Sequence, residues 1–274
     1  MRDGHWQLEG GAAELFQRYL VPGITAKWAE HLVGRALLRA GEAVLDVACG
    51  TGVVARLAAR KVAPGRVAGL DLNAGMLSVA REVSKDAAAI DWIEGSALDL
   101  PFPPAQFDVV LCQLGLQFFP DQPRALHEMY RVLREQGRVA LSVYSPIERT
   151  PGAYAFARAL DEVLGSGASR IKRSEHSFAS TTQLERLVHD AGFRSVEVET
   201  AEQMIEFPSV LDYVRFQLLA TPMTVLLRDK GEPERQAIIS SVASKTASFS
   251  TPAMLNGGKF AFAQEAYVAV ARSG

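Results

Sequence analysis

The sequence is poor in the residues that mark secreted, metal-binding and membrane-spanning proteins. It has two cysteines among 274 residues, Cys49 and Cys112, and neither has a second cysteine or a histidine at a zinc-ligand spacing. We expect two buried free thiols in a reducing compartment and no metal site. There is no run of about 18 uncharged apolar residues, and the N-terminal stretch lacks a basic segment followed by an apolar one. We therefore expect a cytoplasmic protein without a membrane partner.

Excess charge of either sign is also absent. The chain carries 29 basic and 31 acidic residues, for a net charge of −2. Because binding to a phosphate backbone needs a clustered basic surface, we expect no nucleic-acid partner. Apolar residues make up 48% of the sequence, which is enough to build a full hydrophobic core.

Apolar segments alternate with amphipathic helical patterns along the first half of the chain. Five strands are predicted at residues 44–48, 65–73, 90–97, 107–116 and 138–146. Runs that are apolar on both faces suit parallel strands covered by helices on each side. Their alternation with helices predicts an open, mostly parallel sheet with right-handed crossovers.

The remaining segments predict further helices and two more strands. Residues 12–40 predict two helices broken at the Val-Pro-Gly of 21–23, and Gly137 is expected to end the helix before the fifth strand. A helix over 180–193 is expected to be capped by Ser180 or Thr181. The other expected elements are a helix at 152–165, a sixth strand at 195–207, a mainly helical stretch at 208–247 and a last strand at 260–273.

The stretch "VLDVACGTG", residues 44–52, carries the first functional signal. Ligands of open parallel sheets bind at the carboxyl ends of the strands. Gly50 and Gly52 lie just past the first strand, where the lack of a Cβ lets a ligand approach the backbone. Asp71 follows 19 residues after Gly52, at the end of the second strand, and could accept hydrogen bonds from both hydroxyls of a ribose. A dinucleotide and S-adenosylmethionine fit this pattern equally well.

Asp46 begins to separate these two ligands. It lies inside an otherwise apolar strand, where a carboxylate without a partner is costly. Its burial is tolerable if it bonds the amides of the glycine turn or faces a cationic ligand. A pyrophosphate would be repelled by this carboxylate, whereas a ligand with an ammonium and a sulfonium would not.

Five motifs in order resemble class I S-adenosylmethionine-dependent methyltransferases, and are most similar to the branch that includes the ubiquinone/menaquinone C-methyltransferases. They are "VLDVACGTG", "GLDLNAGML", "GSALDLPFP", "FDVVLCQLGLQFFPD" and "MYRVLREQGRVALS". The resemblance covers roughly residues 40–146. It implies an α/β, Rossmann-like, doubly wound, mostly parallel seven-stranded sheet whose last strand is antiparallel. It also implies one domain over 1–274, with an N-terminal helical cap at 1–40, a cofactor-binding core at 41–146 and a C-terminal part at 147–274 with a helical insertion at 208–247.

The resemblance also implies roles for individual residues. Asp46 would orient the amino group of the cofactor, Asp71 would hold the ribose hydroxyls, and Ser96 replaces the acid that the family usually places against the adenine amino group. The other cofactor contacts expected by resemblance are Tyr19, Ala48, Gly50, Thr51, Gly52, Leu72, Met76, Ala97, Leu98, Gln113 and Leu114. Phe118 and Phe119 would shape the acceptor pocket.

Three features of the second half leave alternatives open. His176 is either a general base for an acceptor hydroxyl or a solvated loop residue. The cluster of Arg170, Lys172 and Arg173 is either a solvated loop or the site of an anionic acceptor. The apolar stretch 210–227 fits an acceptor lid, a homodimer surface or a plain core helix.

The expected activity is transfer of a methyl group from S-adenosylmethionine to an O, N or C atom of a small organic molecule. One alternative is a protein that binds S-adenosylmethionine without catalysis. A nicotinamide-dependent oxidoreductase is a second alternative, which Asp46 and the lack of a recognisable hydride-transfer dyad disfavour.

Overall fold

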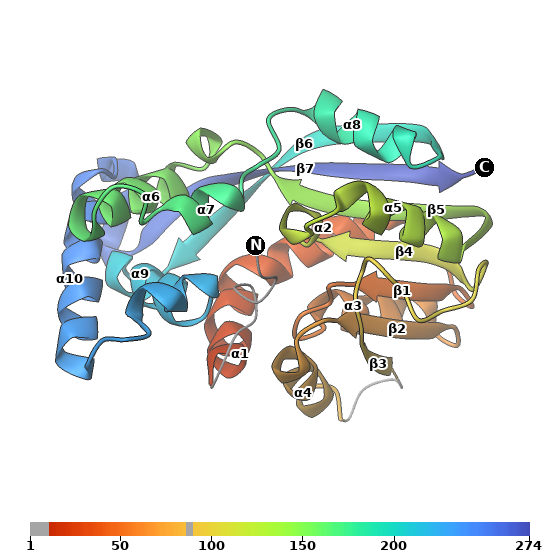
Figure 1. The fold of residues 1–274 in the computed structure, drawn as a ribbon, viewed down its shortest axis with the longest axis horizontal. Coiled ribbons are helices and arrows are strands. Elements are labelled where there is room, and N and C mark those ends of the chain that lie inside the picture. The colour runs from red at the N-terminus through yellow and green to blue at the C-terminus, as the bar shows by residue number, and fades with distance from the viewer. Residues whose placement is uncertain (1–10, 86–89) are drawn as a thin grey trace.

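A seven-stranded sheet forms the centre of the molecule (Figure 1). The computed structural model describes residues 11–85 and 90–274. The strands lie in the order β3-β2-β1-β4-β5-β7-β6, and β7 is antiparallel to both of its neighbours. Their bounds are β1 Ala43–Val47, β2 Arg66–Asp71, β3 Ile90–Glu94, β4 Phe107–Gln113, β5 Leu133–Tyr144, β6 Phe193–Phe207 and β7 Phe260–Ser273. This arrangement confirms the expected Rossmann-like sheet with its last strand antiparallel.

Helices cover both faces of this sheet, as the run of fully buried residues in β1 requires. Successive side chains of a strand point to opposite faces of the sheet, so Val44 packs in the buried cluster on one face and Leu45 in the cluster on the other. The helices are α1 Ala12–Leu15, η1 Phe16–Thr25, α2 Ala26–Ala36, α3 Val53–Val62, α4 Ala74–Glu82, η2 Leu116–Phe118, α5 Gln122–Val132, η3 Ile147–Arg149, α6 Pro151–Leu164, α7 Arg170–Ser174, α8 Thr181–Asp190, α9 Val210–Leu219, η4 Pro222–Leu227, α10 Glu232–Ser248 and η5 Pro252–Gly258. Among the described residues, no helix is both long and apolar enough to cross a membrane.

Two expected helix boundaries are wrong. The chain does not break at residues 21–23, because η1 is a π-helix that continues through Pro22 into α2. Its wider turn accommodates the proline ring, and buried Leu20 and Ile24 hold the segment in the core. Nor does Gly137 end a helix: α5 stops at Val132 and β5 begins at once. A Cβ on Gly137 would lie 2.8 Å from a backbone oxygen, so the glycine serves close packing.

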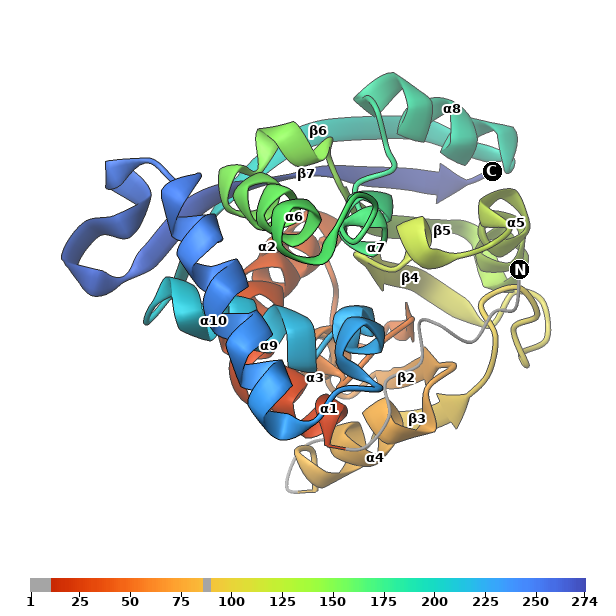
Figure 2. The ribbon, with the colours of Figure 1, turned by 60° about the vertical axis from the view of Figure 1, so that its left-hand side comes forward.

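Strands β6 and β7 extend beyond β5 and carry the helical insertion between them. Only residues 266–272 of β7 pair with β5, whereas residues 260–273 pair with β6. The extension places Phe207, Phe260 and Phe262 around Tyr213 of α9, with ring centroids 5.1 to 5.5 Å apart. These aromatic rings belong to the same buried cluster as the N-terminal helices, and Figure 2 shows α9 and α10 beside those helices.

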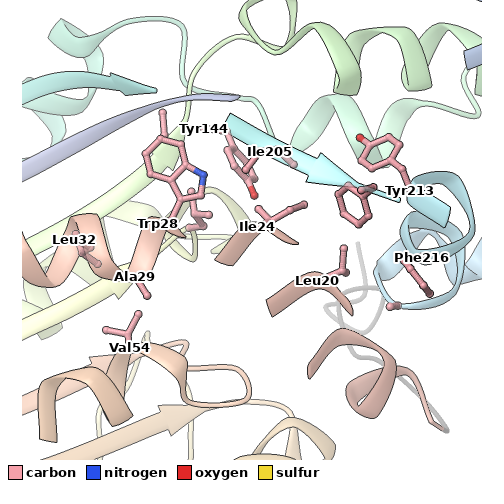
Figure 3. Close-up of a cluster of buried hydrophobic side chains, with 14 of the residues drawn as sticks. Leu20, Ile24, Trp28, Ala29, Leu32, Val54, Tyr144, Ile205, Tyr213 and Phe216 are labelled. Carbon is pink, nitrogen blue, oxygen red and sulfur yellow. The ribbon is translucent and has the colours of Figure 1, made fainter. Parts of the chain in front are cut away.

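The N-terminal helices join this insertion to the sheet (Figure 3). Leu20 and Ile24 face the side of α9 and β6, while Ala29 points toward Val54 on α3; all belong to one buried cluster. The Trp28 indole donates a hydrogen bond of 2.8 Å to Gln264 on β7. Residues 16–25 therefore lie between the carboxyl end of β4 and the helical insertion, whereas α2 runs on over the sheet until Ala36 accepts a hydrogen bond from Arg138 of β5.

Candidate functional site

The turn between β1 and α3 is built from residues in the left-handed region. Ala48, Gly50 and Gly52 have φ values of 56°, 55° and 80°. The two glycines serve different purposes. A Cβ on Gly52 would lie 2.1 Å from the Trp92 ring, whereas a Cβ on Gly50 would meet nothing within 4 Å. Gly52 thus makes room for a core side chain, and Gly50 presents an open backbone face to a ligand.

Asp71 holds this turn from the end of β2. Its carboxylate accepts the Gly50 N–H at 2.7 Å and the Asn73 N–H at 2.9 Å. Burial raises the pKa of Asp71, and these backbone bonds oppose that rise. Because a carboxylate offers about four acceptor positions, Asp71 can hold the turn and still accept a hydroxyl.

Asp46 is buried in β1 with half of its carboxylate unpartnered. One oxygen accepts the Ala55 N–H of α3 at 3.0 Å, and the other has no hydrogen-bond partner. Burial raises the pKa of Asp46 to about 8, and the nearby Asp71 adds to this rise. Removing a carboxylate from water without a second partner is unfavourable, so the site suits a ligand that brings positive charge or N–H donors to Asp46.

Other buried oxygens around the strand ends also lack partners. They are the side-chain oxygens of Gln17, Thr51, Gln113 and Gln117. Buried polar atoms are nearly always paired in native proteins. The amide oxygens of Gln17, Gln113 and Gln117 can only accept, so they match donors such as an ammonium group and ribose hydroxyls, whereas the Thr51 hydroxyl and the unpartnered Gln117 Nε2 can also donate. A pyrophosphate, which offers acceptors, fits the three amide oxygens and Asp46 poorly. The residues present therefore fit S-adenosylmethionine better than a dinucleotide.

The residues expected at the adenine end lie past the ends of β2 and β3. Leu72 is 51% exposed, an uncommon state for a leucine beside a buried strand, while Met76 is buried and packs with Ala13 of the N-terminal cap. The Ser96 hydroxyl accepts the Leu98 N–H at 3.1 Å. The Leu98 carbonyl accepts Arg124 at 2.7 Å, so both backbone groups of Leu98 are already engaged, and Ala97 beside it is buried.

The residues expected on the methyl-transfer side follow β4. Gln113 donates to the Thr25 carbonyl at 3.0 Å, which fastens η1 over the strand end. Leu114 is buried with φ of 51°, and its N–H bonds Ser142 of β5. Phe118 is half-buried. Phe119 packs against the buried cluster that contains Leu45, on the opposite face of the sheet from the cluster of Leu114. Its contacts in this structure are therefore with the core.

Tyr19 lies in η1 and stacks on Phe216 of α9, with centroids 3.9 Å apart. The cap and the insertion therefore meet at this pair. Thr25 and Gln117 belong to the same region and were missed from the sequence. Gln117 lies within the fourth quoted motif but was not singled out there, and Thr25 lies in none of the motifs; buried side-chain atoms without partners identify both.

Of the two alternatives for His176, the solvated loop residue is wrong. This histidine is 7% exposed, and its ring stacks on Tyr144 at a centroid distance of 4.9 Å. Its Nδ1 lies 2.7 Å from the Ser145 carbonyl oxygen, and its Nε2 is buried without a partner. Burial and the charge of Lys172 lower the pKa of His176 to about 3. The imidazole is therefore neutral at physiological pH.

Lys172 likewise departs from the expected solvated cluster. Its ammonium is buried 2.6 Å from Glu175 and 3.4 Å from Gln217 of α9. Arg173 instead pairs with Asp161 at 3.6 Å. Because Lys172 and Arg173 already have carboxylate partners, they are not free to bind an anionic acceptor, whereas Arg170 is exposed, as the solvated alternative expects. In the described part of the chain, no group of three or more His, Cys, Asp or Glu side chains could hold a metal.

Comparison with known proteins agrees with this geometry. Residues 45–141 match the family model described as a methyltransferase domain. The chain is similar to the demethylmenaquinone methyltransferase of Symbiobacterium thermophilum, at 33% identity over 207 residues, covering 69% of this chain and 81% of that protein. It is also similar to the 2-phytyl-1,4-naphtoquinone methyltransferase of Thermosynechococcus vestitus, at 40% identity over 124 residues, covering 45% and 55%.

The fold agrees as well. A crystal structure of a putative methyltransferase from Bacillus halodurans superposes with a TM-score of 0.59 at 23% identity, covering 89% of this chain and 98% of that one. The motifs, the sheet order and the glycine turn thus lead to one assignment. The chain belongs to the class I S-adenosylmethionine-dependent methyltransferases.

Proposed function

We propose that the protein transfers a methyl group from S-adenosylmethionine to a hydroxylated aromatic ring of the naphthoquinol type. Relatives at 33–40% identity are named demethylmenaquinone and phytylnaphthoquinone methyltransferases, which supports this acceptor class. One observation supports S-adenosylmethionine as the cofactor: an oxygen of the buried Asp46 has no hydrogen-bond partner, and the turn that follows its strand is open at Gly50.

In this proposal the residues of the chain bind and orient the cofactor and the acceptor. Asp46 receives the amino group of the cofactor, Gly50 lets its methionine end lie against the backbone, and Asp71 receives the ribose hydroxyls. Leu72 and Met76 cover the adenine, and Ser96 donates or accepts one hydrogen bond at its edge. Bound S-adenosylmethionine supplies an electrophilic methyl group on a sulfonium, and holding an acceptor in line with it provides most of the acceleration.

The surroundings of the strand ends suit an apolar ring. Leu114 of the β4 end shares one buried cluster with Leu20, Ile24, Tyr144 and Phe216. Figure 3 shows several of these side chains, contributed by the cap, by β5 and by the insertion. An apolar acceptor with one or two polar groups would match this lining, as in most small-molecule sites.

The assay uses S-adenosylmethionine with a trideuterated methyl group and 1,4-dihydroxynaphthalene, kept reduced under argon. We expect a product heavier by one trideuteromethyl group in mass spectrometry, and none with Asp46→Ala. If no acceptor of a phenol, naphthol, amine and thiol panel is methylated while S-adenosylmethionine binds, the proposal fails and the non-catalytic binding protein replaces it.

A further inference from the structure

We propose that His176 selects acceptors that carry a hydroxyl or N–H donor, and that its Nε2 accepts this hydrogen bond while the imidazole stays neutral. The inference rests on the proposed function and deepens it, because it names the group that the acceptor must present. It assigns His176 as a positioning residue that touches the acceptor, in place of a general base.

The tautomer of His176 follows from its neighbour. The Ser145 carbonyl oxygen can only accept a hydrogen bond, and it lies 2.7 Å from Nδ1. Nδ1 therefore carries the proton, and the Nε2 of the neutral ring has a lone pair. This Nε2 is buried and has no partner. A buried acceptor without a donor costs free energy that a bound hydroxyl would recover.

The ring is also fixed in place. It stacks on Tyr144 with an interplanar angle of 20°, and the Tyr144 hydroxyl bonds Gln264, which Trp28 bonds in turn. Ser145 directly follows the last residue of β5, and the Leu114 N–H just past β4 bonds the Ser142 carbonyl of that same strand. His176 thus lies at the carboxyl end of β5, beside the end of β4, and ligands of open parallel sheets bind at such strand ends.

The charges around His176 disfavour proton transfer to it. Lys172, on the preceding helix, opposes a second positive charge, and Glu175 is already paired with Lys172 at 2.6 Å. The ring neighbour Tyr144 adds no stabilising charge, since burial raises the pKa of its hydroxyl. A general base works best when its pKa lies near the working pH. His176 therefore suits a hydrogen-bond acceptor role.

The test measures binding, so that it does not depend on turnover. The complex with S-adenosylhomocysteine is titrated under argon with 1,4-dihydroxynaphthalene and with 1,4-dimethoxynaphthalene, which has the same ring but no donor. The proteins are wild type, His176→Phe, His176→Gln and, as the matched control, His189→Phe on the exposed surface of α8. Melting curves and S-adenosylhomocysteine affinity verify that each variant is folded.

We expect the wild type and His189→Phe to prefer the dihydroxy compound by tenfold or more, with no change in this preference between pH 5 and 8. His176→Phe should lose the preference, and His176→Gln, whose amide oxygen can accept, should recover part of it. An unchanged preference in His176→Phe overturns the inference, while the methyl-transfer assay still reports on the proposed function. If the wild type binds neither compound, the aromatic acceptor class and this inference are both overturned.

Discussion

The Asp71 carboxylate connects the end of β2 to the turn after β1, because it accepts the Gly50 N–H at 2.7 Å. The residue expected to hold the ribose thus also fixes the loop expected to hold the methionine end. Asp71→Ala should weaken S-adenosylmethionine binding by about 1–3 kcal/mol through the loss of charge-assisted bonds. Isothermal titration checks this, with exposed Asp91→Ala of β3 as the control. Unchanged affinity in Asp71→Ala would show that the ribose lies elsewhere.

The buried Asp46 predicts a pH dependence of cofactor binding. Its pKa of about 8 keeps it mostly protonated at pH 6 to 7, whereas an ammonium group beside it favours the ionised form. S-adenosylmethionine affinity should therefore rise with pH between 6 and 7.5, with proton release on binding. Titrations in buffers of different ionisation enthalpy measure this release. Asp46→Asn should bind weakly and release none, and proton release equal to that of the wild type would refute the assignment.

The same residue should also limit the stability of the ligand-free protein. Because the folded pKa of Asp46 is raised above its unfolded value of 3.8, stability is lost as pH rises from about 4 toward 8. Asp46→Asn, which needs no ionisation, should melt at a higher temperature than the wild type at pH 8, and the difference should shrink at pH 5. Scanning calorimetry measures both melting temperatures at each pH. An Asp46→Asn protein that melts below the wild type at pH 8 would contradict the raised pKa of Asp46.

The two glycines of the turn should separate binding from folding. At Gly50 a Cβ meets open space, so Gly50→Ala should lower stability only by about 1 kcal/mol for its positive φ while obstructing the cofactor. At Gly52 a Cβ would meet the Trp92 ring at 2.1 Å, so Gly52→Ala should destabilise the fold more strongly. Paired melting and titration curves test this contrast. Full S-adenosylmethionine affinity in Gly50→Ala would remove the argument for close backbone approach.

Ser96 offers a gain-of-affinity test. It replaces an acid expected by resemblance, and its hydroxyl is already engaged with the Leu98 N–H. Ser96→Asp should strengthen S-adenosylmethionine binding by about 1 kcal/mol if its second oxygen accepts the adenine amino group. Ser96→Ala is the comparison variant and should lower the affinity modestly, because it removes the hydroxyl proposed to bond the adenine edge. No gain in Ser96→Asp would place the adenine away from this loop.

The sequence predicted elements whose signals are local. The helix at 152–165, the Ser180 cap of α8 and the last strand at 260–273 all agree with the structure. Each depends on a signal within the segment itself: the helical spacing of apolar residues, a capping residue, or a run of strand-forming residues. The glycine turn and the buried Asp46 also follow from one short stretch of the chain.

The features that the sequence did not predict depend on distant contacts. His176 and Lys172 lie in a polar stretch typical of a loop, and they are buried against residues from other segments, among them Tyr144, Ser145 and Gln217. Pro22 predicted a break, but packing of the cap against the insertion keeps the segment helical. When residues distant in the sequence bury a polar side chain, the segment that carries it shows no regular spacing of apolar residues. No pattern in the chain could therefore reveal this burial.

Cofactor identity is the central claim, and one titration tests it most directly. The purified protein is titrated calorimetrically with S-adenosylmethionine, S-adenosylhomocysteine and NADH. We predict micromolar binding of the first two and no heat from NADH. Binding of NADH alone would contradict the assignment of Asp46 and favour the oxidoreductase alternative.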